Sequence, residues 1–166
     1  DVCPESILQY VAGLVIVNDY SARDVQIPQM QFYKGKSFRT FGPVGPWLCL
    51  LEPGDDQFLL NLNLELRVDG AIRQQDNTRN LVFQPAETLT ELSSVQNFAP
   101  GDLLATGTPA GCALAAPSPR IQRLMGLIPE NTKWRLFIKA QSKRPEYLQP
   151  GQTVTASIRS ECGTID

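Results

Sequence analysis

The sequence predicts a β-rich α+β fold, a roll or sandwich of short strands with few helices. Residues 60–68 (LNLNLELRV) alternate strictly between leucine or valine and polar side chains, which is typical of a half-buried antiparallel strand. Apolar runs at 14–17 and 47–51 indicate two further strands, the first of them buried. Glycine- and proline-containing turns separate these runs at short intervals, a pattern that favours many short strands over long helices.

The remaining elements follow in chain order from local signals. Asp69-Gly70 is a hairpin signal, because both residues tolerate the positive φ angles that a two-residue turn requires. Leu89 and Leu92 are spaced to face one core from a single helix. After Asp19 the sequence pattern predicts turns and strands rather than long helices. The predicted elements are a helical lead-in at 2–9, a helix at 85–94 and a last strand at 154–158.

Residues 113–147 differ from the rest of the chain in charge, with seven basic and two acidic side chains. We expect a helix at 119–125, with three apolar side chains on one face, and a strand at 134–140, where apolar and polar residues alternate. Two interpretations remain open. The segment is either a solvated excursion with ordinary surface lysines, or a lid or dimer element that adds positive charge near an acidic substrate.

Composition bounds the class of protein. With 166 residues, 42% hydrophobic and 19% charged, the chain has the size and balance of one soluble domain with a sizeable core. A net charge of −2 gives no general reason to expect nucleic acid or an anionic membrane as a partner. We see neither an apolar run of the length that a transmembrane helix needs nor a signal-peptide pattern, so we expect a cytoplasmic protein.

The cysteine and histidine content excludes several chemistries. The four cysteines are scattered without a CxxC pair, so we expect free, mostly buried thiols in a reducing compartment. The chain has no histidine, which removes imidazole ligands and both Ser-His-Asp and Cys-His catalysis. Any general base must therefore be an aspartate, a glutamate, a lysine or a metal-bound hydroxide.

Polar residues in three segments are candidates for a site. Asp19 comes directly after the apolar run 14–17, and a carboxylate there is costly to bury unless a metal, an arginine or a cluster of donors meets it. Lys36 lies between a glycine and a serine and could hold a carboxylate or an enolate oxygen. The tight turn at 107–111 (GTPAG) could bind an anionic group through backbone N–H groups and the Thr108 hydroxyl. Together these segments could form a pocket for a small anion.

The same segments carry a resemblance to a known family. In order and spacing, VNDYSARDVQ, FYKGKSFRTFGPVGPW and LLATGTPAG resemble the fumarylacetoacetate hydrolase family, and RVDGAIRQQDNT and YLQPGQTVTASI add to the likeness. The resemblance implies the mixed β-sandwich roll of that family's C-terminal catalytic domain, which agrees with the strand pattern. We therefore expect residues 1–166 to be a single domain of this type that lacks its N-terminal part, with a basic insertion at 113–147.

The resemblance also assigns roles to residues. It implies that Asp19 binds a divalent metal, Mg²⁺ or else Mn²⁺ or Ca²⁺, together with an upstream Glu-x-Glu pair that this sequence does not contain before Asp19. It implies catalytic and substrate-binding roles for Gln26, Lys36 and Thr108, with Gly107 contacting substrate. The motif at 76–78 (DNT) reads as a structural Asx-type turn.

These expectations combine into two functional hypotheses. The first is a metal-dependent enzyme that cleaves a carbon–carbon bond in small dioxo acids from aromatic-compound catabolism, either a hydrolase or a decarboxylase or isomerase. The absence of histidine slightly favours the second type within this chain. The alternative is a catalytically inactive structural or binding half of a duplicated family member. The resemblance also implies a homodimer with a small-molecule substrate and neither nucleic acid nor membrane as a partner.

Overall fold

The computed structural model describes residues 2–160, 164 and 165, which form two compact units. The first unit comprises residues 1–17, 44–111 and 153–166, and the second comprises residues 18–43 and 112–152. Each unit thus combines segments that are far apart in the sequence. The segment 113–147 lies within the second unit.

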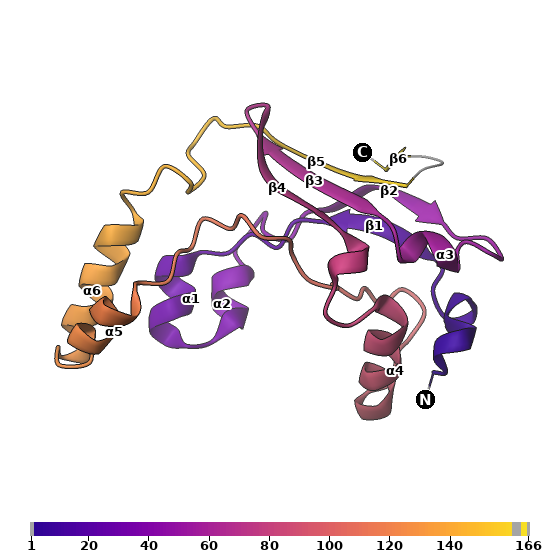
Figure 1. The fold of residues 1–166 in the computed structure, drawn as a ribbon, viewed down its shortest axis with the longest axis horizontal. Coiled ribbons are helices and arrows are strands. Elements are labelled where there is room, and N and C mark those ends of the chain that lie inside the picture. Colours follow the sequence, from indigo (N-terminus) through magenta and orange to yellow (C-terminus); the bar gives the residue numbers. More distant parts are fainter. Residues whose placement is uncertain (1, 161–163, 166) are drawn as a thin grey trace. The chain divides into compact units, whose positions relative to one another are not determined.

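The first unit contains two antiparallel sheets (Figure 1). The smaller sheet pairs β1 (Gly13–Val17) with β2 (Val44–Leu50). The larger sheet has the order β4-β3-β5-β6 and is formed by β3 (Asn63–Val68), β4 (Ala71–Asn77), β5 (Val154–Arg159) and β6 (Thr164–Ile165). This architecture confirms the predicted β-rich α+β class.

The hairpin between β3 and β4 forms where the sequence predicts it. Asp69 and Gly70 have φ angles of 49° and 81°, the positive values that a tight turn between twisted strands requires. The Asp69 carboxylate also accepts a hydrogen bond from the backbone N–H of Thr153, at 2.8 Å, just before β5. The alternation at 60–68 is only partly realised, because β3 begins at Asn63 and Leu60 is exposed.

The core of the first unit is a small cluster of buried apolar residues, contributed mainly by short helices. Buried Val2, Ile7, Leu59 and Leu89 form one cluster. The cluster joins η1 (Pro4–Gln9), α3 (Asp56–Leu59) and α4 (Pro85–Val95), so the predicted lead-in and the predicted helix at 85–94 are both present. The strand at 14–17, predicted as buried, is mostly half-buried, since only Ile16 among its residues is fully buried.

The second unit contains only short helices, in line with the expectation of no long helix after Asp19, but two of them lie at 23–29 and 32–36, where turns and strands were expected. Its helices are α1 (Arg23–Gln29), α2 (Phe32–Lys36), α5 (Pro119–Met125) and α6 (Glu130–Gln141). The strand predicted at 134–140 is wrong, because these residues lie in α6. Trp134, Phe137 and Ile138 are spaced at i, i+3 and i+4 and so form one helical face, and Phe137 breaks the alternation on which the predicted strand rested. The rings of Trp134 and Phe137 meet edge to face, with centroids 6.2 Å apart.

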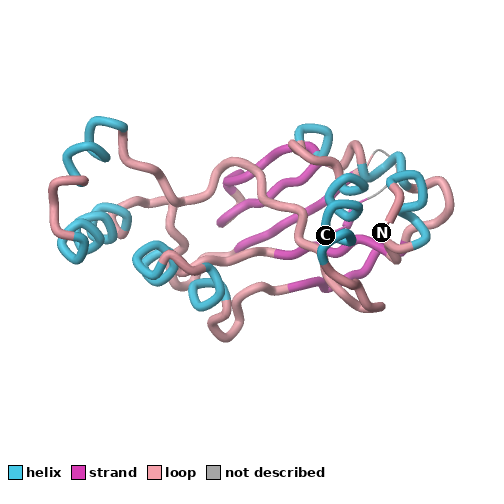
Figure 2. Tube along the Cα trace, turned by 90° about the horizontal axis from the view of Figure 1, so that it is seen from below, coloured by secondary structure: helices cyan, strands magenta, loops and turns pink. Residues whose placement is uncertain are grey.

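A long segment without helix or strand connects α4 to α5. Residues 96–118 are drawn as loop in Figure 2, and they carry the turn at 107–111. Gly107 and Gly111 adopt φ angles of 125° and 107°, which residues other than glycine rarely adopt. The segment bends at Ala110 but has no hydrogen-bonded turn among residues 107–111, so the predicted tight turn is an open bend, which we call the turn at 107–111; its backbone geometry requires glycine at both positions.

The cysteine prediction needs correction. Cys3, Cys49 and Cys112 are exposed, whereas the sequence led us to expect mostly buried thiols. Cys3 precedes η1, and Cys49 lies on β2, whose side chains are largely exposed. Cys162 lies outside the described residues.

The helices are short, and the longest, α6, has 12 residues. Among the residues that the structure describes, no helix combines the length and apolar character needed to cross a bilayer.

Candidate functional site

Asp19 and Lys36 form an ion pair in the second unit. Asp19 lies two residues after β1, and Lys36 is the last residue of α2. The ammonium Nζ of Lys36 donates a hydrogen bond to Oδ2 of Asp19. The Asp19 side chain is 53% exposed and that of Lys36 is 29% exposed. Asp19 is exposed rather than buried, so the expected cost of burying its carboxylate does not arise; it nevertheless has a lysine as its positive partner, and the pair remains accessible to a solute.

The close approach of α1 to α2 positions Lys36. The backbone N–H of Ala22 donates to the carbonyl of Gly35 at 2.8 Å, which ties the start of α1 to α2. A Cβ atom at Gly35 would lie 2.7 Å from Cβ of Gln26, a distance that real side chains essentially never show. Glycine at position 35 therefore allows the two helices to pack, and the next residue, Lys36, reaches Asp19.

Gln26 is the polar residue most deeply buried in this unit, with 5% of its surface exposed. Its amide oxygen accepts a hydrogen bond from Nη1 of Arg23, one helical turn earlier. The sequence analysis did not anticipate this bond, although the i, i+3 spacing of the two residues could have indicated it. A contact between Gln26 and substrate stays a prediction.

An aromatic cluster borders the ion pair along the chain. The ring of Tyr20 meets Phe41 edge to face with centroids 6.3 Å apart, and Phe41 meets Phe38 at 5.5 Å. Burial raises the pKa of the Tyr20 phenol. These contacts link the loop after α2 to the residue that follows Asp19.

Thr108 and Gly107 belong to the first unit, whereas Asp19, Gln26 and Lys36 belong to the second. The Thr108 side chain is exposed and its hydroxyl oxygen accepts a hydrogen bond from Nε2 of Gln74, at 2.9 Å. The same nitrogen donates to the carbonyl of Pro109 at 2.8 Å. The turn at 107–111 is thus attached to β4 by a residue that the sequence analysis did not single out.

The motif at 76–78 has the structural role that the sequence suggests. Asn77 is buried, and its side-chain oxygen accepts the backbone N–H of Arg79, which caps the short helix η2 (Thr78–Asn80). Its amide nitrogen donates to the side-chain oxygens of Asn61 and Asn63. Hydrogen bonds from the Asn80 side chain and from the Asn77 backbone lower the pKa of Asp76.

The donor set fits a divalent metal only in part. Asp19 offers a hard carboxylate oxygen of the kind that Mg²⁺ prefers. The described residues contain no group of three or more His, Cys, Asp or Glu side chains that could hold a metal ion. Asp19 is therefore suited to be one ligand, and the remaining ligands would have to come from outside the described residues, from water or from substrate.

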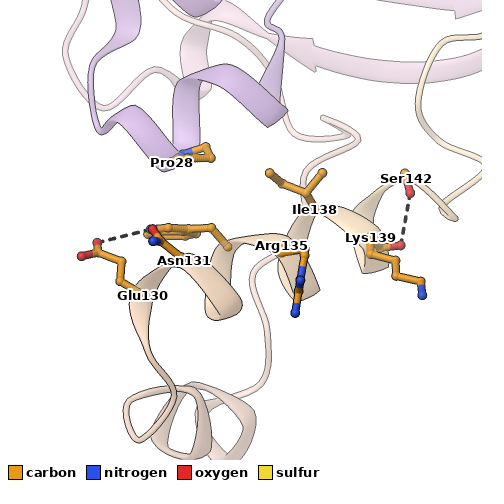
Figure 3. A pocket seen from close by; sticks show the side chains of 8 residues that line it. Pro28, Glu130, Asn131, Arg135, Ile138, Lys139 and Ser142 are labelled. Atoms are coloured by element: carbon orange, nitrogen blue, oxygen red, sulfur yellow. Dashed lines mark hydrogen bonds between the residues drawn. The ribbon is translucent and has the colours of Figure 1, made fainter.

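An open hollow of about 850 Å³ lies in the second unit between α1 and α6 (Figure 3). Pro28 lines it from α1, and seven residues at 130–142 line it from α6 and its C-terminal end, among them Arg135 and Lys139. Trp134 closes part of it and donates to the Glu130 carboxylate at 3.3 Å. The hollow contains none of the residues predicted to form the site.

Comparison with known proteins finds solved structures whose names state an enzyme class. The solved fumarylacetoacetate hydrolase of Exiguobacterium antarcticum is 30% identical with a TM-score of 0.70, and the match covers 99% of this chain and 49% of that one. The 2-hydroxyhepta-2,4-diene-1,7-dioate isomerase of Mycobacterium marinum is 28% identical with a TM-score of 0.68 and has 50% of its chain covered. Hydrolase and isomerase thus share this fold.

A relative found by sequence comparison shares a higher sequence identity with this chain than these two structures do. A protein of Burkholderia lata, whose name gives it as a hydrolase without a stated substrate, is 46% identical over 121 residues. The match covers 72% of this chain and 42% of the relative, so the chain spans less than half of that protein. The family model for the C-terminal domain of fumarylacetoacetate hydrolase matches residues 1–166. On this match, which extends over the full sequence, the chain belongs to the fumarylacetoacetate hydrolase family.

Proposed function

We propose that the protein containing this chain is an enzyme that cleaves or rearranges a bond beside a dicarbonyl group in small dioxo acids. The observation that carries the proposal is the accessible ion pair of Asp19 and Lys36, formed between two of the segments that resemble the family. The family match and the neighbours named hydrolase and isomerase support the reaction class.

Lys36 is the group suited to stabilise developing negative charge. When a bond beside a dicarbonyl breaks, its electron pair moves onto an oxo group and an enolate oxygen forms. The ammonium of Lys36 is held by Asp19 and remains part-exposed, so it can donate to such an oxygen. A donor that is already oriented before the reaction needs no reorganisation when the charge appears.

Asp19 has a second role in the proposal. We assign it as one ligand of a divalent metal, Mg²⁺ or Mn²⁺, that would act as a Lewis acid on the oxo-acid end of the substrate. The carboxylate also orients the Lys36 ammonium, which donates to it. Gln26, buried beside Gly35, and Thr108 with Gly107 in their turn remain the proposed substrate contacts.

The chain offers a reason to rank the possible reactions. Hydrolysis needs a base that takes a proton from water, and the sequence has no histidine for this step. Decarboxylation needs charge stabilisation and a proton return to carbon, which an ammonium can supply. Isomerisation needs one group that takes a proton from the substrate and returns it at another atom, a role that a carboxylate or a neutral lysine can fill. Within this chain's own residues, decarboxylation or isomerisation is therefore the preferred reaction.

Substrate turnover by the full-length protein tests the proposal. Oxaloacetate, an acylpyruvate and fumarylacetoacetate would be supplied in turn with Mg²⁺, and products would be identified by mass spectrometry. Release of CO₂ with pyruvate marks decarboxylation, and two carboxylic acids from the acylpyruvate mark hydrolysis. Lack of turnover of all three compounds contradicts the proposal.

One observation favours a second candidate, a binding or structural half without activity. The described residues hold no group that could complete a metal site around Asp19. Calorimetric titration of the full-length protein with Mg²⁺ and Mn²⁺ distinguishes the two. Binding heat that Asp19→Asn removes supports the enzyme, and absence of heat together with absence of turnover supports the inactive half.

A further inference from the structure

Gln74 lies against the turn that carries Thr108. A Cβ atom added to Gly111 would lie 2.0 Å from the carbonyl oxygen of Arg73 and 3.3 Å from Cγ of Gln74. The turn and β4 are thus in direct contact at this point. The side chain of Gln74 spans the contact and bonds both Thr108 and Pro109.

The chemistry of these partners fixes the direction of both bonds. A backbone carbonyl can only accept, so the Gln74 atom 2.8 Å from the Pro109 oxygen must be the amide nitrogen. That nitrogen carries two hydrogens and no acceptor site. The Thr108 hydroxyl oxygen, 2.9 Å from the same nitrogen, must therefore accept, and its own hydrogen is left to donate elsewhere.

A hydroxyl that accepts one hydrogen bond becomes a stronger donor of another, because successive bonds polarise each other. Thr108 is exposed, so its hydrogen is available to a solute. A carboxylate of a small acid only accepts hydrogen bonds and matches this donor. We propose that Gln74 is a positioning residue that holds Thr108 as a hydrogen-bond donor for a substrate carboxylate; this rests on the proposed function.

Two variants of Gln74 distinguish the effect of reversing the hydrogen bond to Thr108 from the effect of removing it. Gln74→Glu keeps the length of the side chain but can only accept, so it takes the hydrogen of Thr108 and leaves the Pro109 carbonyl without this donor. Gln74→Leu removes both bonds and leaves an apolar side chain of similar size. Gln75→Leu is the matched control, because adjacent strand residues point to opposite faces and Gln75 is exposed.

The test measures steady-state kinetics of the full-length protein with oxaloacetate and Mg²⁺, and with the acylpyruvate if that is the better substrate. We expect Thr108→Val and Gln74→Glu to raise KM about 10- to 100-fold, the usual effect of losing a hydrogen bond to a charged group, with a smaller change in kcat. Gln74→Leu keeps the Thr108 hydroxyl but frees it to rotate, so it should raise KM by less than these two variants and by more than the control. The double variant Gln74→Leu with Thr108→Val should be no worse than Thr108→Val alone, because Gln74 acts through Thr108.

Three outcomes would overturn the inference. If Gln74 variants and Gln75→Leu have equal kinetics in an active protein, Gln74 has no positioning role and the proposed function stands. If Gln74→Leu lowers kcat and thermal stability with KM unchanged, the bond is only structural. If the unmodified protein neither turns over the three substrates nor binds oxalate by calorimetry, the proposed function fails and the inference with it.

Discussion

At the scale of single residues, the contact between Asp19 and Lys36 is the centre of the proposed chemistry. The two residues are 17 positions apart in the sequence and meet through one direct hydrogen bond. Exposed ion pairs contribute only about 0–1 kcal/mol to folding stability. Since both side chains are part-exposed, the contact adds little to stability, and its proposed role in the reaction is open to a direct test.

Replacement of Lys36 tests this view. We expect Lys36→Ala to lower kcat about 10²- to 10³-fold, the usual cost of losing one oriented donor to a developing oxyanion. Lys34→Ala is the control, because it removes the same charge from an exposed position on α2. Thermal unfolding should change little in either variant. Near-normal turnover of Lys36→Ala would contradict the role of this ammonium.

Asp76 gives a prediction about pH. Hydrogen bonds from the Asn80 side chain and the Asn77 backbone lower its pKa in the folded state. The stability that Asp76 contributes is therefore complete above its unfolded pKa of about 3.9 and is lost as pH falls through the lower folded value. We expect Asp76→Asn to be less stable than the parent chain at pH 7, with the difference shrinking below about pH 4.

Urea unfolding at pH 7 and pH 3 measures this difference. Glu91→Gln, which removes one carboxylate from an exposed position on α4, controls for the change in net charge. A stability difference between the Asp76→Asn variant and the parent that is as large at pH 3 as at pH 7 would show that the two hydrogen bonds do not act through the charge.

At the scale of elements, the turn at 107–111 depends on its contact with β4. Both Gly101 and Gly111 have positive φ, but only a Cβ at Gly111 would meet another atom, the Arg73 carbonyl oxygen at 2.0 Å. Comparing alanine at these two positions therefore separates the clash from the backbone strain that both share.

We expect Gly101→Ala to cost about 1 kcal/mol of stability from backbone strain alone. Gly111→Ala should cost about 2–4 kcal/mol, because the turn must also move away from β4. Chemical denaturation of both variants provides the two free energies. Equal losses at the two positions would indicate that the turn and the strand do not pack as closely as described.

The segment 113–147 shows where local patterns become ambiguous. Helix α5 forms where the sequence predicts it, and α6 replaces the predicted strand at 134–140. An apolar residue at every second position fits a strand, but Trp134, Phe137 and Ile138 fit a helical face equally well. The apolar contact between Trp134 and Phe137 in α6 is one that only the helical arrangement provides. Whether the segment acts as a lid or dimer element stays a prediction.

At the scale of the whole molecule, the chain spans about half the length of the solved family members that it matches. Among the described residues, Asp19 belongs to no group of three or more His, Cys, Asp or Glu side chains that could hold a metal ion. We expect Mg²⁺ or Mn²⁺ to bind the full-length protein and raise its thermal midpoint by mass action.

Asp19→Asn should weaken this binding by about tenfold or more, because an amide oxygen is a neutral and poorer ligand for a hard cation. Isothermal titration calorimetry, and thermal unfolding with and without added metal, check this weakening independently of turnover. Identical binding heats for the parent protein and the variant would contradict a ligand role for Asp19. The predicted homodimer is checked in the same samples by light scattering.

The sequence by itself determined the family, the β-rich class, the hairpin at Asp69-Gly70 and the need for glycine at positions 107 and 111. These features rest on strand periodicity and on backbone angles that few residues can adopt, both of which are local properties of the chain.

Only the tertiary structure decided which polar groups meet. Residues 19 and 36 come together because Gly35 packs on Gln26, and Thr108 meets Gln74 across 34 positions of sequence. Hydrogen-bond partners far apart in the chain depend on how separate elements pack, and no local pattern encodes that packing. The same reason explains why 134–140 resolved as a helix: the burial of Phe137 against its neighbours, rather than the alternation of residue types, selected the conformation.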